Sequence, residues 1–153
     1  MIRFYSTILF ILILAKSVYS QTKSPSEFLG YTLGERFSQH HQVIDYFNHV
    51  AENNKNVNLV TYGETYENRP LTLAFISSEA NMKNLEDLRL DQLKSARIID
   101  GKASQNDIAI VWLSYNVHGN ESVSTEVSMQ TLFELVDPEN KRSKEWLKNT
   151  III

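Results

Sequence analysis

The chain contains no cysteine in its 153 residues. This absence excludes disulfide bonds, thiolate metal sites and a lipid-modified N-terminal cysteine. The sequence also lacks a dense basic patch, and its net charge is −3, so we expect no nucleic acid partner. No internal repeat or linker divides the chain, and its length suits one domain with a hydrophobic core.

The first 20 residues have the composition of a signal peptide. Arg3 supplies the positive charge, an apolar stretch follows over residues 8–15, and we expect cleavage before Gln21. Lys16 interrupts the apolar stretch, which is shorter than the roughly 20 residues that span a bilayer, so we expect no stable membrane anchor. The sequence therefore predicts an exported protein, secreted or periplasmic, whose net charge becomes −5 when Arg3 and Lys16 are removed.

Helix and strand patterns alternate along the rest of the chain, which is typical of an α/β fold. Residues 21–34 are polar and predict an N-terminal arm over the surface of a domain formed by residues 35–153. The periodicity predicts helices over 38–53, 84–98, 122–136 and 139–149, and strands over 59–65, 71–77, 108–113 and 150–153.

Several of these elements carry expectations about burial. Residues 108–113 are a continuous apolar run, typical of a parallel strand that is covered on both faces. Apolar side chains surround the 122–136 helix, which indicates burial on most sides. Residues 150–153 begin another buried strand where the sequence stops, so we expect a truncated domain. The expected inner positions of the 84–98 helix are Leu85, Leu88, Leu93 and Ala96.

A candidate metal site follows the apolar strand at 108–113. There the chain reads His118-Gly119-Asn120-Glu121. This segment follows the carboxyl end of a strand, where the binding and catalytic sites of α/β proteins usually lie. At the first turn of a helix, residues i and i+3 have Cβ atoms about 5–6 Å apart. An imidazole and a carboxylate at that distance can share one zinc ion. Gly119 leaves space for a close approach. His118 and Glu121 are therefore the candidate ligands.

The chain contains a second histidine and glutamate at the same spacing. His49 and Glu52 project opposite the apolar stripe of the 38–53 helix, so we expect both on its solvated face. His40 and His41 are interpreted as polar residues at the start of that helix. None of these side chains is expected to bind metal.

Two segments resemble the zinc carboxypeptidase family. Residues 116–121, Asn-Val-His-Gly-Asn-Glu, resemble its zinc-binding segment, and the H-G-N-E wording is closest to the regulatory carboxypeptidase branch and its bacterial relatives. Residues 62–71 resemble its G-x-S/T-x-E-G-R-P hairpin, with Asn68 in place of glycine at a turn where asparagine tolerates positive φ. The order of elements over residues 30–153 agrees as well. The resemblance implies a three-layer sandwich in which a mixed sheet is flanked by helices.

The resemblance also implies a function. His118 and Glu121 would bind one Zn²⁺ ion, and the parent enzyme would hydrolyse the C-terminal bonds of peptides or proteins through a metal-activated water. In the family, the third ligand and the catalytic glutamate lie far downstream, so no catalytic residue is assigned here and we expect the chain to be inactive alone. Asn120 replaces an arginine that polarises the substrate in some branches. Glu67 and Arg69 are interpreted as a surface ion pair.

Two alternatives stay open. Aspartoacylases and succinylglutamate desuccinylases also use H-G-N-E, but those chains reach the motif soon after the N-terminus and are cytosolic. Here a hairpin and an export signal precede the motif, which favours the carboxypeptidase. The other alternative is a non-catalytic secreted binding module on the same fold, which would lack the later histidine and glutamate.

Overall fold

The computed structural model describes residues 22–104 and 106–153, so the expected signal peptide at 1–20 lies outside the described residues. The strands are β1 (Val57–Glu64), β2 (Pro70–Ile76), β3 (Ala109–Val111) and β4 (Thr150–Ile152). The helices are α2 (Pro25–Leu29), α3 (His40–Asn53), α4 (Glu79–Lys83), α5 (Leu85–Ser95), α6 (Val123–Val136) and α7 (Lys141–Trp146).

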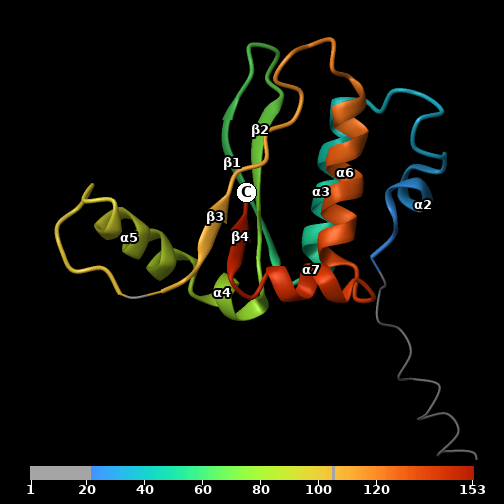
Figure 1. The fold of residues 1–153 in the computed structure, drawn as a ribbon. Helices are drawn as coiled ribbons and strands as arrows, with labels where there is room; N and C mark the ends of the chain where they lie inside the picture. Colours follow the sequence, from blue (N-terminus) through green and yellow to red (C-terminus); the bar gives the residue numbers. More distant parts are fainter. Residues whose placement is uncertain (1–21, 105) are drawn as a thin grey trace, which may run out of the picture.

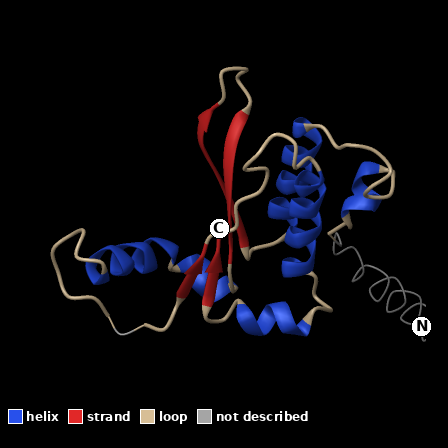
Figure 2. Cartoon of the chain, turned by 45° about the horizontal axis from the view of Figure 1, so that its top comes forward, coloured by secondary structure: helices blue, strands red, loops and turns tan. Residues whose placement is uncertain are grey.

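The strands form one mixed sheet in the order β1-β2-β4-β3. β1 pairs antiparallel with β2, β2 pairs antiparallel with β4, and β3 runs parallel to β4. α3 and α6 lie side by side on one side of the sheet, whereas α5 lies on the opposite side, away from the strands (Figure 1). Figure 2 shows the same arrangement from a second direction. The expected α/β fold, a mixed sheet flanked by helices, is confirmed.

The core lies between the sheet and the helices α3, α6 and α7. Tyr46 and Val50 on α3 and Met129 on α6 are completely buried. Their spacing follows the helical repeat, which is why the sequence predicted both long helices to within two residues. The other buried members of the core are Val57, Ile76, Leu132, Leu135, Val136, Leu147 and Ile152.

The turn between β1 and β2 has the conformation that the sequence predicted. Asn68 adopts a positive φ of 57°, and its backbone N–H donates to the carbonyl of Thr65 at 2.9 Å. Glu67 and Arg69 form an exposed ion pair of 2.7 Å, which confirms their interpretation as surface charges. An exposed pair of this kind contributes little to stability.

Two short helices were not predicted. α2 lies within the expected arm and begins with a capping box: Ser24 and Glu27 each accept a hydrogen bond from the other's backbone N–H. α4 is preceded by the N-cap residue Ser78, whose hydroxyl accepts from the N–H of Asn81 at 3.3 Å. Each helix has five residues, too few to show a helical repeat, so capping rather than periodicity defines them.

Three expectations about burial were wrong. β3 is not covered on both faces: Ile110 is 45% and Val111 40% exposed, because β3 is an edge strand against which the described helices do not pack. α6 buries one side only, since Val123 and Val127 are exposed on the side away from α3 and the sheet. The expected inner residues of α5 are not buried, because that helix stands off from the sheet (Figure 1).

No helix within residues 22–104 and 106–153 has both the length and the apolar character needed to cross a bilayer.

Candidate metal centre

The His118–Glu121 segment forms a turn between β3 and α6. The backbone N–H of Glu121 donates to the carbonyl of His118 at 3.1 Å, which closes the turn. α6 begins two residues later, at Val123. The sequence placed this motif in the first turn of the helix, which is wrong by about one turn. His118 and Glu121 nevertheless lie close together, as expected, because a closed turn also brings residues i and i+3 together.

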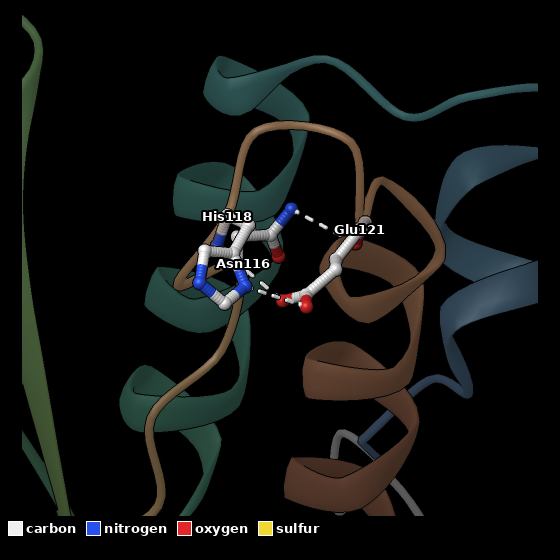
Figure 3. Close-up of polar contacts among 3 residues, drawn as sticks. All are labelled: Asn116, His118 and Glu121. Atoms are coloured by element: carbon white, nitrogen blue, oxygen red, sulfur yellow. Dashed lines mark hydrogen bonds and ion pairs between the residues drawn. The ribbon is translucent and has the colours of Figure 1, made fainter.

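The two candidate ligands contact each other. Nδ1 of His118 lies 2.8 Å from Oε1 of Glu121, and the backbone N–H of His118 donates to Oε2 at 3.3 Å (Figure 3). Because an ionised carboxylate only accepts hydrogen bonds, Nδ1 carries the proton in this arrangement. The side chains are 71% and 46% exposed. The pair is therefore accessible to an ion and to a substrate.

This donor set fits zinc at two coordination positions. Two ligands of a tetrahedral zinc ion with bonds near 2.1 Å lie about 3.4 Å apart. The His118–Glu121 contact, at 2.8 Å, therefore has to open by roughly half an ångström and lose the Nδ1 proton. Both side chains are exposed, so no packed neighbour opposes that change. Within the described ranges, no group of three or more His, Cys, Asp or Glu side chains could hold a metal.

Gly119, inside the motif, has no close neighbour on the side where a side chain would project. A Cβ atom built on Gly119 would meet no described atom within 4 Å, and the residue does not have a positive φ. The space beside Gly119 is therefore open, as expected, and no described backbone segment enters it.

A groove of about 1020 Å³ lies between the sheet and the helices α3 and α6. Its walls are mainly apolar and include Phe47, Leu73 and Trp112. Asn116, at the start of the motif, lines this groove, whereas His118 and Glu121 do not. His118 and Glu121 therefore lie outside the groove.

The structure corrects the environment of the second histidine–glutamate pair. Glu52 is exposed, as predicted, but His49 is partly buried beneath the N-terminal arm. Its Nε2 accepts a hydrogen bond from the backbone N–H of Lys23 at 3.1 Å, and its ring lies 5.0 Å from that of Phe28. Burial, followed by the charge of Lys23, lowers the pKa of His49. Sequence periodicity could not reveal this, since the covering residues come from another segment.

His40 and His41 are the first two residues of α3, as predicted. Both line the groove between that helix and the sheet. Neither belongs to a group of three or more candidate metal ligands among residues 22–104 and 106–153. In the described part of the chain, His118 is the histidine whose ring lies within ion-pair distance of a carboxylate.

One family model matches most of the chain. It is described as zinc carboxypeptidase and matches residues 43–153, which include the β1–β2 hairpin and the His118–Glu121 turn. No curated protein and no solved structure matches the chain. The family match begins in α3 and extends through β4, well over half of the sequence. The chain therefore belongs to the zinc carboxypeptidase family.

Proposed function

We propose that the protein is a zinc-dependent carboxypeptidase, with His118 and Glu121 as two ligands of a single Zn²⁺ ion. The observation that carries this proposal is the contact of 2.8 Å between the imidazole Nδ1 and the carboxylate Oε1 in an exposed turn. The family match supports the same reading. The proposed substrate is a peptide or protein with a free C-terminus.

The residues of this chain have defined tasks in the proposal. His118 would offer a ring nitrogen to the ion and Glu121 a carboxylate oxygen. The negative charge of the carboxylate would offset part of the charge of the ion. Zinc, when bound, supplies a Lewis acid that polarises a peptide carbonyl and lowers the pKa of water. The exposed turn leaves space on the solvent side for the substrate. A further ligand and a general base are also needed, so residues 1–153 alone are inactive in this proposal.

The wording of the motif supports the regulatory carboxypeptidase branch and its bacterial relatives. The E-N-R-P hairpin, which precedes the motif, supports a peptidase over an aspartoacylase-like deacylase. We also propose that the protein is exported after cleavage before Gln21. Mass spectrometry of secreted material should find a chain that begins at Gln21, and an intact Met1 would refute the processing.

The test of function uses the full-length natural protein rather than residues 1–153 alone. It is purified without a metal-affinity step and dialysed against metal-free buffer. Wild-type protein should retain about one zinc per chain, and His118→Ala and Glu121→Gln should each lose most of it. His41→Ala is the matched control, since it removes an exposed histidine from α3. Equal zinc content in wild type and His118→Ala would reject the assignment.

Activity distinguishes the alternatives. A carboxypeptidase should shorten peptides that have a free C-terminus and leave C-terminally amidated peptides intact. An aspartoacylase-like enzyme should instead cleave N-acetylaspartate. Wild-type protein that lacks zinc and both activities would favour a binding module on the same fold.

A further inference from the structure

We infer that Asn116 is a positioning residue that fixes the turn of the metal ligands relative to the segment that follows β3. Asn116 reaches the motif from the strand side and lies beside both candidate ligands (Figure 3). The inference rests on the proposed function of His118 and Glu121. The H-x-x-E pattern by itself indicates no role for Asn116.

The backbone of Asn116 supplies the first part of the argument. Its φ is 54°, a left-handed conformation that it shares, among the described non-glycine residues, with Asn68 and Arg97. Asparagine enters this region more readily than most side chains. At residue 116 this conformation turns the chain from the exit of β3 towards the His118–Glu121 turn. A residue that disfavours positive φ would therefore change how the turn is presented.

The side chain supplies the second part. Nδ2 of Asn116 donates to the backbone carbonyl of Glu121 at 3.3 Å (Figure 3). The same carbonyl accepts the N–H of Ser124 at 3.0 Å, at the start of α6. The asparagine amide thus connects the segment that leaves the sheet to the entrance of the helix.

The other hydrogen bonds of the turn do not make this connection. Both the Glu121 N–H to His118 carbonyl bond and the His118–Glu121 side-chain contact lie within residues 118–121. They close the turn but do not fix it relative to residues 112–117. Among the described residues, the Asn116 amide makes the one hydrogen bond between that segment and the turn. Loss of this bond should therefore free the turn from residues 112–117 and loosen its own hydrogen bonds, so that His118 and Glu121 move relative to each other.

Two substitutions separate the backbone from the side chain. Asn116→Gly keeps positive φ accessible and removes the amide, whereas Asn116→Ala removes both features. Asn68→Ala is the matched control, because Asn68 has a φ of 57° in the β1–β2 turn and, among the described residues, makes no hydrogen bond with residues 116–121. It imposes the same kind of backbone strain without touching the metal ligands.

The first readout needs no metal. In the natural protein freed of zinc, NMR magnetisation transfer should show several-fold faster amide exchange at Glu121 and Ser124 in Asn116→Gly, and a larger increase in Asn116→Ala. Asn68→Ala should leave both amides unchanged. Wild-type exchange in Asn116→Ala, or equal acceleration in Asn68→Ala, would overturn the inference.

The second readout is the zinc dissociation constant, measured by competition with a chromophoric chelator. Substitution of a residue that orients metal ligands typically weakens binding by about 10–100-fold, and we expect this range for Asn116→Ala. The urea midpoint should shift equally in Asn116→Ala and Asn68→Ala, so a loss of zinc affinity confined to the first variant is not a general effect of instability. Wild-type protein without zinc would refute the proposed function, whereas unchanged amide exchange would refute the role of Asn116.

Discussion

Gly34 and Glu126, which are 92 positions apart in the sequence, are joined by a hydrogen bond of 2.7 Å from the glycine N–H to the carboxylate Oε2. The hydroxyl of Ser38 donates to the other oxygen at 3.0 Å. Glu126 is only 6% exposed and lies in the first turn of α6, where a negative charge is favourable. The carboxylate therefore connects the N-terminal arm to the helix that follows the candidate metal ligands.

Glu126→Ala should lower the free energy of unfolding by about 1.5–3 kcal/mol, because it leaves the Gly34 N–H and the Ser38 hydroxyl without their carboxylate acceptor. Urea unfolding measures this loss, and amide exchange at Gly34 reports whether the arm detaches. Glu52→Ala removes an exposed glutamate from α3 and should change stability by less than about 0.5 kcal/mol. Equal effects of the two substitutions would contradict the tie between Gly34 and Glu126.

His49 should make stability depend on pH. Burial beneath the arm, together with the charge of Lys23, lowers the pKa of His49 below its ordinary 6.5, while Glu52 opposes this shift. The unfolded chain therefore binds the proton more readily than the folded one. The contribution of neutral His49 is complete above about pH 6.5 and is lost as the pH falls through the folded-state value.

The measurement is urea unfolding at several values between about pH 8 and pH 5. Wild type should lose stability relative to His49→Gln as the pH falls, since glutamine can accept the Lys23 N–H bond without titrating. His41→Gln, on the same helix, is the matched control. Parallel stability profiles of wild type and His49→Gln would show that this histidine is not coupled to folding.

Ser77 connects the end of β2 to β4 and α7. Its side chain is completely buried, and Oγ lies 2.7 Å from the carbonyl of Thr150 and 3.1 Å from that of Leu147. Oγ also accepts from Nδ2 of Asn81 at 3.0 Å. Ser77→Ala should cost about 1–3 kcal/mol in urea unfolding, because buried polar groups lose their partner. Ser95→Ala, at the exposed end of α5, should have almost no effect, and a similar loss there would disprove the role of Ser77.

The sequence predicted the long elements and the proximity of His118 to Glu121 because each depends on local spacing. α3 repeats apolar residues along one side, α6 carries them on most sides, and the β1–β2 turn carries an asparagine that accepts positive φ. His118 and Glu121 meet because residues three apart meet in a helix and in a closed turn alike. Ser24 and Glu27 also carried a readable capping signal for α2, which periodicity alone overlooks.

The rest depends on contacts between distant segments, which no local pattern contains. His49 has the spacing of a solvent-facing residue, yet the backbone of Lys23 and the ring of Phe28 cover it. Residues 109–111 have the composition of a buried strand, but burial is set by what packs against a strand rather than by its own side chains. The hydrogen bond from Gly34 to Glu126 could not be predicted either, because every residue except proline has a backbone N–H and the sequence does not show which one donates.

Zinc should stabilise the folded natural protein if His118 and Glu121 bind it. A ligand that binds only the folded state adds about 2.7 kcal/mol at a free concentration 100 times its dissociation constant. Calorimetry should therefore show a rise in Tm on adding zinc, and a chelator should reverse it. His118→Ala should remove most of this rise, because the loss of one protein ligand greatly weakens zinc binding, whereas His41→Ala should keep it. A rise that survives in His118→Ala would mean that zinc binds elsewhere on the protein, and the turn between β3 and α6 would lose its assignment as the metal centre.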